Sequence, residues 1–362
     1  MTMTDKKLVL GMALIDGYGG LHGAWRAPHV DPGTYADVDA TVRHAKAAER
    51  GRFTFLFTPD FPAVRGNVEH STISNLMDPL IQLSAVARET TNIGFVVTGS
   101  TTFQESFNTA RQFKALDVLS HGRMGWNAVT TSDPAVAANY GRPIADRNER
   151  YQRAHEAIQI VQALWGSWQE DAWVKDQAAD RFIDPSKLQP INLQGQYVAS
   201  RGPLAIPPSE QGQPVVFTSG GPSPHLLSIA GRYASGFIAE VWTIEEARAQ
   251  RQLVRNAARR AGRDPDEIKY FPGVMTTVAT VVGPGELHAD HLQEWFEAGA
   301  ADGFWVTPDI YEDGVDAFVD EVVPILQERG IYPTEYPGTT LRANLGVPYQ
   351  YGLDPRSTSA EQ

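Results

Sequence analysis

The sequence predicts an α/β protein whose eight parallel strands close into a (β/α)8 barrel. Short apolar segments alternate with longer segments in which apolar residues recur at helical spacing, and this alternation occurs eight times. No series of strands is joined by tight hairpin turns, so a parallel sheet covered by helices is expected. The length of 362 residues suits one barrel with insertions, and eight is the number of units that closes it.

The first half of the chain shows the alternation most clearly. Apolar residues three or four positions apart, such as Val38, Val42 and Ala45, indicate helices, and short apolar runs that end at polar residues indicate strands. The glycine after the first helical segment is a typical helix end. The expected strands are 8–15, 53–60, 93–100 and 124–129, and the expected helices are 35–50, 76–89, 107–119 and 147–165.

An inserted excursion and a tail complete the predicted single domain of residues 1–362. Residues 167–213 are rich in Pro, Asp and Gln and show little periodicity, so they form an excursion between helix 4 and strand 5. Residues 330–362 are an irregular C-terminal tail, expected to pack across the outside or onto a neighbouring subunit. Between them, strands are expected at 214–219, 236–242, 268–282 and 303–307, and helices at 224–233, 244–261, 287–298 and 315–329.

Composition limits the classes of function. The chain has a formal net charge of -12 and no cysteine, so nucleic acid is not expected as a partner. The basic residues Arg255, Arg259 and Arg260 are spaced like the solvated face of one helix. No metal site is predicted, because thiolates are absent and the histidines lack a metal-ligand spacing. Without a signal peptide or a membrane-spanning apolar run, we expect a cytoplasmic protein with no membrane partner.

The segment 116–131 is the most informative stretch of the chain. It reads as the end of a helix, a Ser-His-Gly turn and a strand buried on both faces, with Asn127 near the end of the strand. An amide side chain in an apolar strand needs polar partners. Asn127 therefore either tightens a local turn or faces a polar ligand.

A barrel would bring polar residues from the strand ends together. The carboxyl ends of its strands lie on one face, which is where catalytic residues are found. Each such residue alone could equally cap a helix or a turn, whereas convergence of all of them would indicate a functional site. The residues expected to converge are Asp60, Thr98, Ser100, Asn127, Thr130, Ser219 and Trp242.

The turn 219–223, Ser-Gly-Gly-Pro-Ser, is a candidate phosphate cradle. It lies between a predicted strand and a predicted helix, where backbone N–H groups and the positive helix end favour an anion. It lacks the Lys of a Walker loop and the spacing of a dinucleotide fingerprint. Since no serine-nucleophile motif is present either, an organic cofactor is expected to supply the chemistry.

Several motifs together resemble the bacterial-luciferase-like flavin monooxygenases. The resemblance is to the branch that includes nitrilotriacetate monooxygenase, dibenzothiophene sulfone monooxygenase and pristinamycin synthase. It covers nearly the whole chain and implies a (β/α)8 barrel of the bacterial luciferase type. The motifs are 119–131 (Leu-Ser-His-Gly-Arg-Met-Gly-Trp-Asn-Ala-Val-Thr-Thr), 24–28, 48–60, 139–141, 148–151, 201–204, 211–214, 299–304 and 334–342.

The resemblance implies a two-component enzyme. It would use reduced FMN, delivered by a separate NAD(P)H:flavin reductase, and O2 to oxygenate a small organic substrate at sulfur, nitrogen or carbon. It also implies a homodimer or homotetramer. Two rival hypotheses remain: a deazaflavin-dependent oxidoreductase on the same barrel, and a flavin-binding relative without turnover.

The resemblance also assigns roles to individual residues. Asp60 and Asn127 would face the flavin ring, with Thr98 or Ser100 nearby. Catalytic roles fall to Asn127 and to His22, which corresponds to a histidine on the substrate side in related enzymes. The residues assigned to the FMN phosphate are Tyr151, Gly220, Gly221 and Ser223, with Arg147 at a position where the branch has histidine.

One further departure from the branch concerns the lid. Residues 278–283 run almost directly into the next helix, so the long insertion that normally follows strand 7 is shortened. That insertion normally helps to cover the active site, so its shortening bears on the substrate, the lid and the oligomer contacts.

Overall fold

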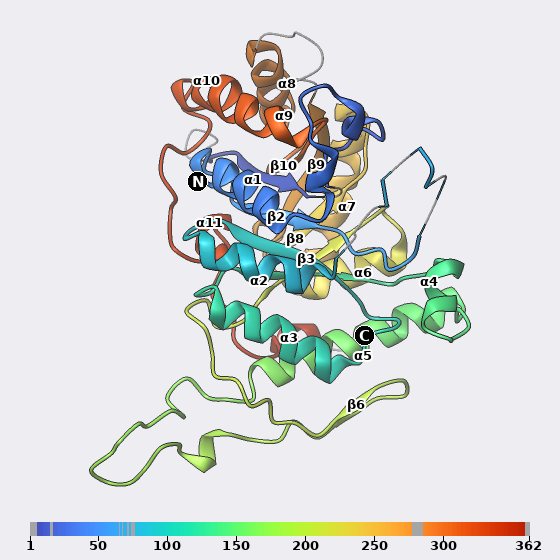
Figure 1. Ribbon diagram of the computed structural model, residues 1–362. Helices are drawn as coiled ribbons and strands as arrows, with labels where there is room; N and C mark the ends of the chain where they lie inside the picture. Colours follow the sequence, from blue (N-terminus) through green and yellow to red (C-terminus); the bar gives the residue numbers. More distant parts are fainter. Residues whose placement is uncertain are drawn as a thin grey trace.

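Eight parallel strands form a closed barrel in the order β1-β2-β3-β4-β7-β8-β9-β10 (Figure 1). The predicted (β/α)8 fold is therefore confirmed. The computed structural model describes residues 6–14, 17–64, 66, 68–70, 72–73, 77–276 and 285–358. The barrel strands are β1 (Val9–Ala13), β2 (Phe55–Thr58), β3 (Gly94–Ser100), β4 (Met124–Val129), β7 (Val215–Ser219), β8 (Gly236–Ala239), β9 (Lys269–Thr276) and β10 (Gly303–Pro308).

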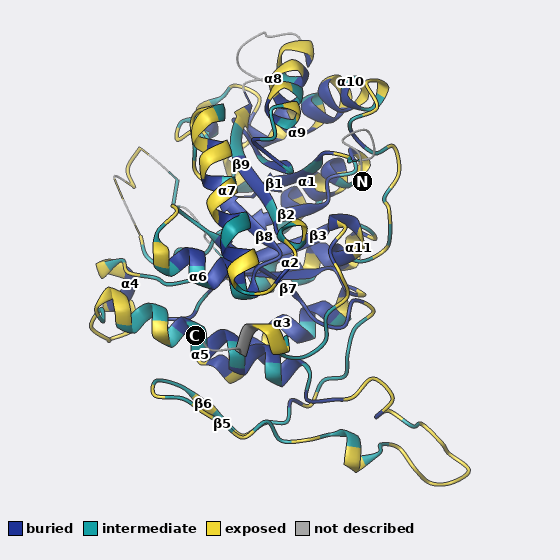
Figure 2. Ribbon diagram, turned by 180° about the vertical axis from the view of Figure 1, so that it is seen from behind, coloured by how far each residue is buried: buried dark blue, intermediate teal, exposed yellow. Residues whose placement is uncertain are grey.

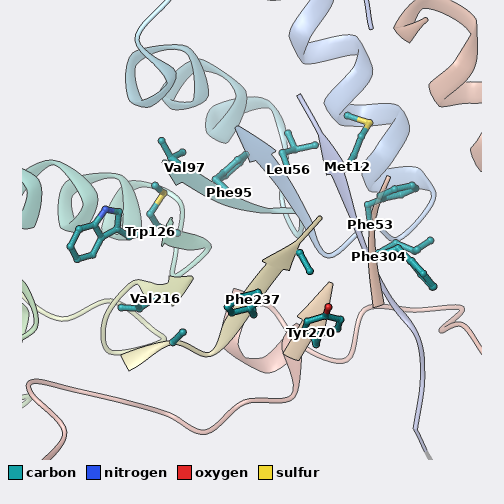
Figure 3. Close-up of a cluster of buried hydrophobic side chains, with 14 of the residues drawn as sticks. Met12, Phe53, Leu56, Phe95, Val97, Trp126, Val216, Phe237, Tyr270 and Phe304 are labelled. Carbon is teal, nitrogen blue, oxygen red and sulfur yellow. The ribbon is translucent and has the colours of Figure 1, made fainter. Parts of the chain in front are cut away.

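The barrel wall is apolar on both faces. Alternate residues of a strand point to opposite sides, so Leu56 packs outward among the helices while Phe55 and Phe57 belong to a separate interior cluster. Figure 3 shows the outward layer, which includes Phe95 and Trp126 on neighbouring strands. Two apolar faces explain why the strands read as continuous hydrophobic runs in the sequence.

Three aromatic rings fill the middle of the barrel. The ring centroids of Phe55, Phe217 and Phe271 lie 5.3 to 6.1 Å apart. Glycines on neighbouring strands leave room for them: a Cβ on Gly11 would lie 2.2 Å from the ring of Phe55, and one on Gly236 would lie 2.1 Å from that of Phe217. The interior is a packed core, so space for a ligand must lie above it.

Helices cover the outside of the barrel and turn their exposed faces to solvent (Figure 2). Many begin at an acidic or hydroxyl side chain that accepts a backbone hydrogen bond, such as Asp37 before α1 and Asp78 before α2. Among the described helices, none is both long and apolar enough to cross a membrane. The covering helices are α1 (Val38–Arg50), α2 (Pro79–Glu89), α3 (Ser106–Leu119), α5 (Arg147–Trp165), α6 (Pro224–Tyr233), α7 (Ile244–Arg260) and α8 (Gly285–Glu297).

Two segments differ from the sequence prediction. Residues expected to form a loop contain the short helix α4 (Pro134–Asn139), which starts because Asp133 accepts hydrogen bonds from two of its backbone N–H groups. The helix predicted at 315–329 is divided into α9 (Tyr311–Ala317), a π-helical turn η6 (Phe318–Val322) and α10 (Val323–Glu328). Pro324 lacks a backbone donor, which accounts for the break in regular α-helical bonding there.

The excursion extends away from the barrel at the bottom of Figure 1 and is mostly exposed. It contains the 3-10 helix η4 (Pro185–Lys187) and the antiparallel strands β5 (Leu193–Gln194) and β6 (Ala199–Ser200). Between β9 and α8 only residues 277–284 intervene. The predicted shortening after strand 7 falls on this segment, which lies outside the described residues.

The C-terminal tail enters the barrel instead of lying across its outside. Its helix α11 (Leu341–Leu345) places Leu341 in the interior cluster, with no exposed surface. The Leu341 side chain lies where a Cβ on Gly94 or Gly125 would be, 2.7 and 3.1 Å away. These glycines stand near the starts of β3 and β4, so the tail closes the end of the barrel opposite the strand carboxyl ends. The expected external packing of this part of the tail was wrong.

Buried polar groups fasten the tail to this closed end. The Arg342 guanidinium donates to the carbonyl oxygens of Gln213 (3.3 Å) and Pro214 (3.3 Å). Nearby, Lys114 Nζ lies 3.9 Å from Asp117 Oδ2, and neither side chain is exposed. Burial lowers the pKa of Lys114 to about 8. Because unpaired charges are costly in such surroundings, these contacts fix the tail in one position.

Replacing Leu341 by Ala is expected to destabilise the fold. The substitution removes a fully buried side chain and leaves a cavity between Gly94 and Gly125. The free energy of unfolding, measured by urea denaturation, should fall by about 2–5 kcal/mol. Leu119→Ala is the control, because Leu119 is 67% exposed and its loss should have little effect. Equal stability of the two variants would contradict the plugging role of Leu341.

Candidate active site

A cavity of about 580 Å³ opens at the carboxyl ends of the barrel strands. Its floor is formed by interior positions of β3, β4 and β7, and its walls by the loops that follow the strands. The described residues that line it are Phe57, Pro59, Asp60, Phe61, Thr98, Asn127, Val129, Thr131, Ser132, Asp133, Pro134, Ser219, Gly220, Ile238, Glu240 and Trp305. Catalytic residues of (β/α)8 barrels are found at this end, so the cavity is the candidate active site.

Asn127 stands at the centre of the cavity floor. Its Nδ2 donates to Thr98 Oγ1 (2.9 Å) and to Ser219 Oγ (3.2 Å), which links β3, β4 and β7. The side chain is 1% exposed, and its Oδ1 accepts no hydrogen bond from the described residues. A buried acceptor without a donor is costly, so this atom is suited to receive a hydrogen bond from a ligand in the cavity.

The structure separates Thr98 from Ser100, which the sequence left as alternatives. Both point inward from β3, but Thr98 lines the cavity beside Asn127. The Ser100 hydroxyl oxygen accepts hydrogen bonds from the N–H groups of Thr102 (3.2 Å) and Phe103 (3.4 Å) and from the Thr131 hydroxyl (2.8 Å). Ser100 thus organises the turn after β3, and Thr98 is the better placed to touch a ligand.

Asp60 lies between the active-site cavity and a second cavity of about 210 Å³. It follows β2 by two residues and lines both spaces, as Thr98 does. Burial, with a smaller contribution from the negative charge of Asp78, raises the pKa of Asp60 from its ordinary value of 3.8 to about 6. This carboxyl group can therefore exchange a proton close to neutral pH.

The predicted phosphate turn follows β7 and leads into α6. Gly220 lines the active-site cavity with φ at +129°, a conformation that favours glycine. Its N–H donates to Ile238 O (3.1 Å), and the N–H of Ser223 donates to Gly221 O (2.9 Å). The Ser223 hydroxyl caps α6 by accepting from the N–H of Leu226. Two of the backbone donors expected to cradle phosphate are thus used within the protein.

A neighbouring cavity of about 370 Å³ contains the remaining predicted phosphate residue, Tyr151. It lies between α5 and the start of α6 and is lined by Asn148, Tyr151, Gln152, His155, Pro224, His225 and Ser228. His225 Nε2 is 2.7 Å from Asn148 Oδ1, and its ring is 5.2 Å from that of Tyr151. Arg147 is exposed, with its guanidinium 5.9 Å from the Tyr151 ring. Cationic and polar side chains therefore surround this helix start, as anion binding requires.

Convergence of the predicted residues is extensive but incomplete. Asp60, Thr98, Asn127, Ser219 and Gly220 line the active-site cavity, and Tyr151 lies in the neighbouring one. The turn that contains Gly220, Gly221 and Ser223 links the two cavities. Not among the described lining residues of either cavity are His22, which is exposed in the loop after β1, Ser100, Thr130, Arg147 and Trp242.

Sequence reasoning missed several lining residues. Strand β8 was expected to end at Trp242 but ends at Ala239, so Glu240 is the first residue beyond it and lines the cavity. Trp242 is 87% exposed. Thr131 and Asp133 follow β4 and were overlooked because the loop after this strand was not examined for lining residues. A correct strand end would have identified Glu240, whereas His225 gave no signal beyond its place after the Gly-Gly turn.

The fold and site define a family. Residues 24–300 match the Luciferase-like monooxygenase family. The chain belongs to this family, and the resemblance inferred from its motifs is confirmed.

Individual relatives are similar over nearly all of the chain. N-acetyl-S-(2-succino)cysteine monooxygenase of Bacillus subtilis (strain 168) is 31% identical, with 96% of this chain and 98% of the relative covered. Dibenzothiophene-sulfone monooxygenase of Rhodococcus erythropolis is also 31% identical, with 90% and 93% covered. The structure of EDTA monooxygenase from Chelativorans sp. BNC1 superimposes with a TM-score of 0.87 at 29% identity, covering 96% of this chain and all of the other.

The Bacillus relative also shows that this chain is shorter than its homologues. The alignment with it is 435 positions long, although this chain has 362 residues. Part of the relative therefore has no counterpart here, in keeping with the shortened segment expected after the seventh strand.

The raised pKa of Asp60 predicts a pH-dependent effect of replacing it by Asn. Above the folded pKa of about 6, the folded protein contains a carboxylate that burial disfavours, so D60N should be the more stable protein at about pH 8. As the pH falls from 6 towards 3.8, the carboxyl group becomes protonated, and the advantage of D60N should disappear. Thermal midpoints of both proteins across this range give the measurement.

Asp180→Asn serves as the control for this experiment. Asp180 is an exposed carboxylate on the excursion, far in sequence from the cavity. Its replacement should leave the stability difference small and nearly independent of pH. A D60N advantage that persists unchanged at low pH would show that charge burial at Asp60 is not the cause.

Proposed function

We propose that this protein is the oxygenase of a two-component system, which uses reduced FMN and O2 to oxygenate a small organic substrate. Membership of the luciferase-like monooxygenase family supports the reaction class. The observation that carries the proposal is the buried Asn127 Oδ1, an acceptor without a partner that lines a cavity at the strand carboxyl ends. The polar edge of a flavin ring offers the N–H donor that this atom lacks.

The two adjoining cavities fit the two parts of FMN. The ring would lie in the cavity of about 580 Å³ against Asn127 and Thr98, with Asp60 at its edge. The phosphate would lie at the start of α6 near Tyr151 and Arg147, where the helix end favours an anion. The turn 220–223 joins these places and would support the ribityl chain. Ser100 and His22 have no direct place in this arrangement of the described residues.

The residues of the chain would contribute binding, orientation and protection from water. When bound, reduced FMN supplies the two electrons with which O2 gives one oxygen atom to the substrate and the other to water. Asn127, held by Thr98 and Ser219, would fix the ring plane. Asp60 would donate or accept a proton beside it. Phe57, Ile238 and Trp305 would shield this chemistry from solvent.

We infer the remaining properties of the system from the same family relation. A separate NAD(P)H:flavin reductase would deliver the reduced flavin, because the barrel of this chain accounts for a flavin site but assigns no site to a nicotinamide. A cytoplasmic location and a homodimer or homotetramer are proposed on the same basis.

Oxygen uptake tests the proposed reaction. With FMN, NADH, catalase and a purified flavin reductase present, adding a screened sulfonated, chelating or heterocyclic compound should raise O2 consumption and yield its monooxygenated product. Catalase removes the background that free reduced flavin generates. Uptake that never depends on this protein, across the screen, would favour a flavin-binding relative without turnover.

Replacing Asn127 by Leu should weaken FMN binding by about tenfold or more, since the variant loses both the bridging donor and the buried acceptor. Fluorescence quenching on titration with FMN measures the affinity. Ser100→Ala is the matched control, because it disturbs the neighbouring turn without touching the cavity. Unchanged affinity in N127L would contradict the assigned role. Titration of the native protein with a deazaflavin addresses the rival cofactor, and a clear preference for it would overturn the choice of FMN.

A further inference from the structure

The charge of the active-site cavity bears on the substrate. The described lining residues include three acidic side chains, Asp60, Asp133 and Glu240, and no Lys, Arg or His. Arg26, on the loop after β1, is already engaged: its guanidinium donates to His70 O (3.1 Å) and lies 5.3 Å from the Trp25 ring. A substrate with carboxylate groups would therefore meet like charges without a described cation to compensate them.

The three acidic groups differ in how far their charge is already compensated. Asp133 Oδ1 accepts hydrogen bonds from Ala135 N–H (2.9 Å) and Val136 N–H (3.2 Å) at the start of α4. Asp60 is half-buried next to the expected ring site, and its charge is disfavoured by burial. Glu240 is exposed on the cavity wall beyond β8. Glu240 is therefore the carboxylate best placed to attract a group that enters from solvent.

Aromatic surface lies next to Glu240. Trp305 lines the same cavity, and its indole Nε1 donates to the carbonyl oxygen of Ala239 (3.3 Å), the residue that precedes Glu240. The Trp305 ring packs edge-on against Phe57, with centroids 5.7 Å apart. A carboxylate beside an indole ring is a combination that binds organic cations, because the ring face and the anion attract the same charge.

We propose that the substrate carries an ammonium or similar cationic group on an apolar body, recognised by Glu240 and Trp305. This inference rests on the proposed function and specifies the substrate class of the same cavity. It sets this protein apart from two of its relatives, whose named substrates, EDTA and N-acetyl-S-(2-succino)cysteine, carry several carboxylates.

Three matched probes test this charge preference. Para-(methylthio)benzylamine, para-(methylthio)benzyl alcohol and para-(methylthio)benzoate share a ring and a thioether and differ in one charged group. Calorimetric titrations of the protein saturated with FMN should rank the amine first and the benzoate last, with at least about a tenfold difference between them. Equal affinities, a preference for the benzoate or no measurable binding of any probe would overturn the proposal.

Variants assign the preference to a residue. In Glu240→Gln the amine should lose about tenfold of affinity, whereas the alcohol should change by less than about twofold. Glu245→Gln is the control, because Glu245 is exposed in the first turn of α7 and does not line the cavity. An undiminished amine preference in E240Q would refute the role of Glu240.

FMN binding is measured before the probes are added. Failure of the protein to bind FMN would contradict the proposed function itself. Normal FMN binding combined with the wrong charge order would refute the substrate class and leave the proposed function standing.

Discussion

Closure of the barrel around an aromatic interior is the constraint on which the site depends. Phe55, Phe217 and Phe271 occupy the middle of the barrel because glycines on adjacent strands leave no side chains in their way. Leu341 seals the far end. With the middle and one end filled, a ligand can enter only above the rings, where the carboxyl ends of the strands meet. Packing thus decides the location of the chemistry.

The same packing fixes the orientation of the polar residues. Residues of a strand alternate between the two faces of the wall, so Thr98, Asn127 and Ser219 all point inward at one level. Each neighbour uses the donor group of Asn127, and the acceptor Oδ1 is left for a ligand. A buried amide is costly unless it is bonded, so the fold holds an energetically incomplete site that a flavin would complete.

The two ends of the barrel treat buried charge differently. At the closed end, Lys114 pairs with Asp117, and Arg342 donates to backbone carbonyls, so each charge has partners within the protein. At the open end, Asp60, Asp133 and Glu240 share a cavity in which no described cation takes part. Paired charges fix one structure, whereas unbalanced acidic groups create a field that acts on whatever enters.

The sequence by itself determined the fold and most of the candidate site. Eight apolar segments with polar ends specified the barrel, and Asn127 stood out because an amide is unusual in an apolar strand. The tertiary structure alone decided what depends on strand ends and long-range contacts. It distinguished Thr98 from Ser100, whose hydroxyl is used in a turn, and replaced Trp242 by Glu240 because β8 ends early. It also placed Leu341 inside the barrel, since no local pattern records which distant surface a short helix will fill.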